Sequence, residues 1–215
     1  MITIIDNFYT DPDSVIQLAK EFPIISCGPA KTISLEELDQ QFYKNFSSAV
    51  LGMININPNK RYTVDSFFSK HVLSKPDLLN IGWWRTAGHN PTSCRYDESS
   101  EHLVFCGEIM LTKDPHPDSI FEIGKVKPHL NWDTNKLIDE TCNYYTIPRE
   151  KYFDGAITFE EFEQEYNKHE NNYYSVLKIK NEYNKFIAWT GKHVIHREQR
   201  YSTQLAQYFF VSEWD

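Results

Sequence analysis

The sequence has no clustered cysteines, no long apolar run and no excess of positive charge. Its four cysteines are scattered without a Cys-x-x-Cys pair, which argues against a zinc ribbon or a disulfide scaffold and favours a reducing compartment. No apolar stretch approaches the length of a membrane span, and the first residues lack the basic start and apolar run of a signal peptide. We therefore expect a soluble, cytoplasmic protein without a membrane partner.

The charge balance is acidic, with a formal net charge of −8 at pH 7. Proteins that bind nucleic acid through its phosphates are normally basic, so we expect no nucleic-acid partner. A glycine-rich phosphate loop and a nucleophile elbow are also absent. What the sequence has in excess is aromatic residues, 15% of the chain, which suit the pleated surfaces of a β-rich core.

The pattern of short elements predicts one domain over residues 1–215. Residues 1–60 are expected to form a strand and two helices, the first starting at Pro12 and the second at a capping box of Ser34 and Glu37. Short apolar runs separated by turn residues predict core strands within 62–125 and 175–213. Helices followed by many strands indicate a mainly β fold with flanking helices, and the expected architecture is a jelly roll, or double-stranded β-helix.

The segment 126–174 is expected to hold loops and one inserted helix. Thr158 and Glu161 form the capping box of that helix, and its predicted buried side includes Phe162, Tyr166 and Tyr173. Four prolines between Pro115 and Pro148 predict long loops around the mouth of the roll, where a substrate or partner would bind.

Two histidines, His193 and His196, lie three residues apart in "KHVIHR". Side chains alternate between the two faces of a strand, so these imidazoles point to opposite sides if the segment is extended. Val194 then shares a face with His196, while Arg197 lies on the other face. Only one of the two histidines can face a metal ion from this strand.

Non-haem Fe(II) oxygenases hold their metal with two histidines and one carboxylate. The sequence contains a literal His-x-Asp, His116 and Asp118 in "KDPHPDS". The prolines place this motif in a turn, where the ligands would face solvent. We interpret it as a polar loop.

Three longer segments are similar to one known group of proteins: "MITIIDNFYTDPDSVIQLA", "GWWRTAGHNPTSCRYDESSEHLVFCGEIMLT" and "YNKFIAWTGKHVIHREQRYSTQLAQYFF". Together they resemble the 2-oxoglutarate/Fe(II)-dependent oxygenase superfamily, nearest to the small prolyl-hydroxylase-like members found in bacteriophages. The resemblance implies a jelly roll, Fe(II) and 2-oxoglutarate as cofactors, and hydroxylation of a prolyl or other peptidyl side chain or of a small molecule.

The resemblance places Asp97 at the carboxylate ligand of the iron and His196 at the distal histidine. Arg95 stands where the first histidine is expected, and a guanidinium has no lone pair for iron. Beside Asp97 it would form a bidentate ion pair instead. His89, His102 and His129 remain alternatives for the third ligand.

A second departure is Gln204, which stands where the family has an arginine for the far carboxylate of 2-oxoglutarate. Glutamine supplies only neutral hydrogen bonds. Arg197 and Arg200 are nearby in the sequence and are the candidates to replace that arginine.

Two functions follow from this pattern. The first is an oxygenase with iron held by Asp97, His196 and a third ligand, acting with 2-oxoglutarate on a peptide or small molecule. The second is a jelly roll that kept the fold and lost the chemistry, serving as a binding or structural module of a phage particle, with other virion proteins as partners. The expected location is the host cytoplasm or the virion.

Overall fold

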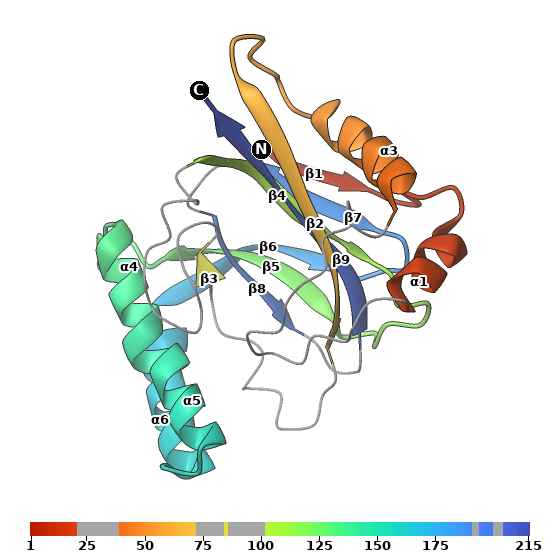
Figure 1. Ribbon diagram of the computed structural model, residues 1–215. Coiled ribbons are helices and arrows are strands. Elements are labelled where there is room, and N and C mark those ends of the chain that lie inside the picture. The colour runs from red at the N-terminus through yellow and green to blue at the C-terminus, as the bar shows by residue number, and fades with distance from the viewer. Residues whose placement is uncertain (21–38, 72–83, 86–101, 191–193, 200–203) are drawn as a thin grey trace.

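The computed structural model describes residues 1–20, 39–71, 84–85, 102–190, 194–199 and 204–215. Two antiparallel sheets face one another (Figure 1), with strand orders β1-β7-β4-β9-β2 and β3-β8-β5-β6. The strands are β1 (Ile2–Ile5), β2 (Arg61–His71), β3 (Trp84–Arg85), β4 (Leu103–Met110), β5 (Ile120–Val126), β6 (Tyr173–Lys180), β7 (Phe186–Thr190), β8 (Ile195–Gln199) and β9 (Gln204–Trp214). This is a jelly roll with flanking helices, which confirms the predicted fold class.

Two helices, α1 (Pro12–Lys20) and α3 (Gln40–Leu51), cover the outward face of the five-stranded sheet (Figure 1). Their apolar stripes bury Val15 and Phe46 against Phe186 and Phe209 of the sheet. The described part of the second helix begins after Asp39, whose carboxylate accepts hydrogen bonds from the first turn. The predicted capping box of Ser34 and Glu37 lies outside the described residues.

Asn184 joins the N-terminal segment to the sheet. Its backbone has a φ of 59°, a left-handed conformation that asparagine tolerates better than most residues. Its side-chain amide accepts from the backbone nitrogen of Tyr9 (2.9 Å) and donates to the carbonyl of Tyr9 (2.8 Å), while its own backbone nitrogen donates to Met110 (2.7 Å). All three segments that carry the sequence resemblance therefore meet at Asn184.

A second helical layer lies on the outward side of the four-stranded sheet (Figure 1). It consists of α4 (Thr134–Thr141), a π-helical turn (Cys142–Thr146), α5 (Ile147–Phe153) and α6 (Phe159–Glu170). The capping box of Thr158 and Glu161 at the start of α6 is confirmed. Within the described ranges, no helix combines the length and apolarity needed to cross a membrane.

Two expectations for this region were wrong. Residues 134–153 are helical instead of forming loops, and Pro148, one of the prolines behind that expectation, stands in the first turn of α5, where a proline costs no hydrogen bond. Tyr173 is the first residue of β6 and not part of the inserted helix, which ends at Glu170. The Tyr173 hydroxyl donates to Glu140 of α4 (2.5 Å), so this tyrosine ties the helical layer to the sheet.

Arg197 of β8 also connects the helical layer to the four-stranded sheet. Its guanidinium hydrogen-bonds to the fully buried carboxylate of Glu122 on β5 and to both carboxylate oxygens of Glu170 at the end of α6 (2.8 and 2.7 Å). Burial alone would raise the pKa of Glu122, but the hydrogen bond and charge of Arg197, with a smaller contribution from Lys178, outweigh it and lower that pKa. The ion pair therefore connects two strands and a helix on the outward face.

The two sheets bury a second apolar cluster between them. Phe121, Ile123 and Ile179 reach it from the four-stranded sheet, and Cys106, Ile187 and Trp189 reach it from the five-stranded sheet. Successive residues of β7 alternate, since Phe186 and Ala188 pack in the outward cluster and Ile187 and Trp189 pack in this inward one. Ile187 and Trp189 therefore lie on the face of the five-stranded sheet that is turned to the interior of the roll.

The closest approach in the five-stranded sheet is at Gly107 of β4. A Cβ atom there would lie 2.2 Å from the carbonyl oxygen of Ile187 and 2.7 Å from the Cα of Ala188, both in the backbone of β7. We predict that Gly107→Ala lowers the free energy of unfolding by about 3 kcal/mol, because the backbone of β7 must shift. Gly52→Ala, whose Cβ would come no closer than 3.3 Å to a neighbouring atom, the carbonyl oxygen of Ser48, is the control and should cost less than about 1 kcal/mol in the same urea titration. Equal losses would contradict this packing.

Arg197 and Lys178 both contact Glu122, one buried and one with a side chain that is 62% exposed. We predict that Arg197→Met destabilises the protein by about 3 kcal/mol, because it leaves the Glu122 carboxylate buried without its guanidinium. Lys178→Met removes an exposed cation from the same carboxylate and should cost less than about 1 kcal/mol. Chemical denaturation of both variants measures the difference, and similar losses would show that Glu122 is not held by Arg197.

Candidate functional site

His196 lies inside the roll. It is on β8 and faces the cluster between the sheets, where its ring stacks on Phe121 (centroids 5.7 Å apart) and lies beside Trp189 of the opposite sheet (4.9 Å). Val194 packs in the same cluster, whereas Arg197 lies on the outward face with Glu122. The alternation expected for this strand is therefore confirmed from Val194 to Arg197, and His193 lies outside the described residues.

The imidazole of His196 is held in its neutral form. Burial lowers its pKa to about 4, against a smaller opposing effect of the hydrogen bond to the Val194 carbonyl. That carbonyl lies 3.4 Å from Nδ1, which favours the tautomer with the proton on Nδ1 and the lone pair on Nε2. A neutral imidazole with this lone pair is the form that binds a transition metal.

The remaining residues predicted for the site fall into three groups. Gln204, at the start of β9, is fully buried and lies within the roll. Arg197 is on the other side of β8, so the structure does not bring it together with His196 or Gln204. The others, Asp97, Arg95, Arg200 and His89, lie outside the described residues.

The alternative histidines are engaged elsewhere or exposed. The ring of His102 stacks on Trp214 at 4.1 Å, and Nδ1 lies 3.1 Å from the carbonyl oxygen of Glu213. His129 is exposed in the chain between β5 and α4. His116 and Asp118 form an exposed turn, as the sequence predicted. In the part of the chain that the structure describes, no three His, Cys, Asp or Glu side chains are grouped as they would be around a metal ion.

Gln204 belongs to a buried polar cluster whose other members the sequence did not reveal. Its Nε2 donates to the hydroxyl of Ser119 (2.7 Å), just before β5, and the carbonyl of Ser119 accepts from the backbone nitrogen of Asn181 (3.0 Å), just after β6. All three side chains are 0% exposed. We name them the Ser119–Asn181–Gln204 cluster. In the sequence, Ser119 and Asn181 look like ordinary turn residues, and only the pairing of β5 with β6 brings them together.

The fit of the two implied cofactors differs. For iron, the inward imidazole of His196 is a suitable ligand, and the carboxylate expected from Asp97 lies outside the described residues. For 2-oxoglutarate, the residues at Gln204 do not fit the far carboxylate, because the surrounding cluster contains only amide and hydroxyl groups. Of the Lys and Arg residues whose side chains the structure describes, Arg197 is the one that is buried, and it lies on the outward face.

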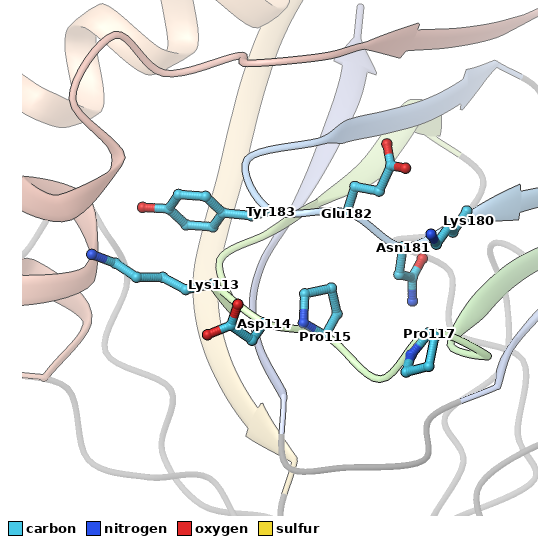
Figure 2. Close-up of a pocket in the computed structure, with 8 residues that line it drawn as sticks. All are labelled: Lys113, Asp114, Pro115, Pro117, Lys180, Asn181, Glu182 and Tyr183. Atoms are coloured by element: carbon cyan, nitrogen blue, oxygen red, sulfur yellow. The ribbon is translucent and has the colours of Figure 1, made fainter.

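A surface pocket of about 320 Å³ lies next to this cluster, between the loop before β5 and the turn after β6 (Figure 2). Pro115 and Pro117 line it, and Lys113 and Tyr183 on its rim both bind Asp13 of α1 at 2.8 Å. Figure 2 shows their polar ends directed away from the prolines. Asn181 is the one lining residue that is fully buried, and its amide points toward the segment of Pro117. None of the residues predicted for the site lines this pocket.

The chain matches no protein-family model, and no curated protein matches it. Solved structures match it over 98% of its length. HygX from Streptomyces hygroscopicus with iron bound has a TM-score of 0.54 at 8% sequence identity, with 81% of that chain covered. HygX with nickel and 2-oxoglutarate bound gives 0.54 at 9% identity, with 82% covered. The protein thus has a jelly roll similar to that of a protein crystallised with iron and with nickel and 2-oxoglutarate.

Proposed function

We propose that the protein is an Fe(II)-dependent oxygenase in which His196 and Asp97 hold the metal. The observation that carries this proposal is the neutral imidazole of His196, which faces the interior of the roll between Phe121 and Trp189. Further support comes from the similar fold of HygX, which has been crystallised with iron and with nickel and 2-oxoglutarate. The proposed substrate is a prolyl or other peptidyl side chain or a small molecule, and the proposed setting is the cytoplasm of a phage-infected cell.

The residues around His196 suit the task of holding a metal. Phe121 and Trp189 fix the plane of the imidazole, and the Val194 carbonyl fixes its tautomer, as partners of a metal-bound histidine usually do. The aromatic and aliphatic side chains packed around His196 leave it only partly exposed, and reduced contact with water strengthens electrostatic interactions there. Bound Fe(II) would supply the activation of dioxygen needed to hydroxylate a C–H bond.

A second candidate is a binding or structural module, such as a component of a phage particle that works with other virion proteins. The neutral surroundings of Gln204 favour it, because they remove the charge that 2-oxoglutarate would need. Arg95, at the place of the first histidine ligand, favours it as well. This protein would keep the roll and bind no metal.

Metal binding separates these two functions. We predict that Fe(II), added anaerobically to the full chain, binds with one-to-one stoichiometry and that His196→Gln weakens binding at least tenfold, because an amide replaces an imidazole ligand. Asp97→Asn should weaken it similarly. His129→Gln removes an exposed imidazole and is the control. Isothermal titration of the four proteins measures the affinities, and equal affinities for wild type and His196→Gln would refute the proposed metal site.

The pKa of His196 makes a separate prediction for the metal-free protein. The folded pKa of about 4 lies below the ordinary value of 6.5, so the unfolded chain takes up a proton first as the pH falls. The contribution of His196 to stability is therefore complete above pH 6.5 and is lost between pH 6.5 and 4, by about 3 kcal/mol. In EDTA, His196→Gln should lose less stability than wild type over this interval. Parallel urea titrations from pH 7 to 4 give the difference, and parallel curves would show that the imidazole is not held neutral.

A further inference from the structure

The Ser119–Asn181–Gln204 cluster and His196 lie at different points along β5: Ile123 pairs with His196, and Ser119 comes just before the first residue of the strand. Four residues of a strand span about 13 Å. Between these two points lies Phe121, whose ring stacks on His196. A ligand with one end at a metal on His196 and the other end at the cluster would lie along this part of β5.

Three polar atoms of the cluster have no hydrogen-bond partner: Oε1 of Gln204 and both Oδ1 and Nδ2 of Asn181. Each belongs to a side chain that is 0% exposed. Buried amide groups are nearly always paired, because burial of an unpaired one is costly. The unpaired amide atoms of Asn181 and Gln204 indicate that a ligand forms hydrogen bonds with them.

The unpaired atoms specify the chemistry of that ligand. Two of them are acceptors, Oε1 of Gln204 and Oδ1 of Asn181, and one is a donor, Nδ2 of Asn181. A carboxylate carries no hydrogen, so it would face two oxygens that it cannot satisfy. A primary amide or an alcohol offers both a donor and an acceptor and can satisfy both kinds of atom.

The charges of the described residues around the cluster also favour an uncharged ligand end. Arg197 is the one buried cation among the Lys and Arg side chains that the structure describes, and Glu122 and Glu170 hold it on the outward face. Glu108, on the inward face of β4 opposite Tyr208, is a buried acid. A second carboxylate would enter this interior without a described cation to neutralise it.

We propose that the Ser119–Asn181–Gln204 cluster binds the uncharged, hydrogen-bonding end of a small ligand and discriminates against a carboxylate. This deepens the proposed function and rests on it for the other end of the ligand, which would lie at the metal of His196. The co-substrate is then a short 2-oxo acid with a carboxamide or hydroxyl at its far end, in place of the second carboxylate of 2-oxoglutarate.

The test compares 2-oxoglutarate with its 5-amide, which has the same length and an uncharged end. Both are titrated calorimetrically into the full chain loaded with Ni(II), which does not turn over. We expect the amide to bind at least tenfold more tightly, because a site made for a hydrogen-bonding group leaves its own atoms unpaired with the wrong ligand. Gln204→Arg should reverse the preference, and Gln41→Arg, which adds the same charge on an exposed part of α3, should leave it unchanged.

A second experiment measures ligand binding at the cluster in the absence of metal. Propionamide and propionate are added to the ¹⁵N-labelled protein in EDTA, and the side-chain amide signals of Asn181 and Gln204 should shift with propionamide only. If Gln204→Arg does not fold, Asn181→Leu, which removes both unpaired atoms of that residue, should abolish the amide preference.

The outcomes separate the two proposals. Equal or tighter binding of 2-oxoglutarate overturns the neutral-end inference while Ni(II) binding upholds the metal site, and Arg200→Gln then tests for a cation at Arg200. Binding of Ni(II) but of neither acid also overturns the inference. Failure of Ni(II) to bind overturns the proposed oxygenase, and the propionamide shifts still decide the nature of the cluster.

Discussion

The ion pair of Arg197 with Glu122 and Glu170 determines how β8 is oriented. The guanidinium is held by a fully buried acid on β5 and by an acid at the end of α6, so its face of the strand must point outward to the helical layer. Because side chains of a strand alternate, the next residue toward the N-terminus must point inward. His196 is that residue, and its position between Phe121 and Trp189 follows from an interaction in which it takes no part.

The same ion pair keeps the guanidinium of Arg197 out of the interior of the roll. Breaking it would leave Glu122 buried and unpaired, which is strongly unfavourable, so Arg197 is retained outside. Among the described residues, the inward polar groups include the neutral imidazole of His196, the hydroxyl and two amides of the Ser119–Asn181–Gln204 cluster and the buried acid Glu108. Such an interior suits a metal ion at one end and an uncharged hydrogen-bonding group at the other. It does not suit a dicarboxylate, although the fold resembles one crystallised with 2-oxoglutarate.

Sequence patterns predicted what depends on neighbouring residues, the jelly roll and the capping box of α6, and the family resemblance selected His196 as the histidine inside the roll. It missed what depends on distant pairing. The partners of Arg197 lie 75 and 27 residues away, so "HR" gave no sign that the arginine was engaged. Ser119 and Asn181 read as turn residues, and their meeting with Gln204 required the register of β5, β6 and β9. The start of α5 was hidden by Pro148, a proline in the first turn of that helix.

The geometry of β8 also rules out one route by which the charge at Gln204 could be restored. For Arg197 to face the interior, the strand would have to turn over or slip by one residue, and either change moves every side chain to the other face. His196 would then leave the interior together with Val194, and Glu122 would lose its buried partner. An inward Arg197 and an inward His196 are therefore mutually exclusive. A metal site built on His196 must work with the neutral cluster at Gln204, unless a residue from another segment brings a cation to it.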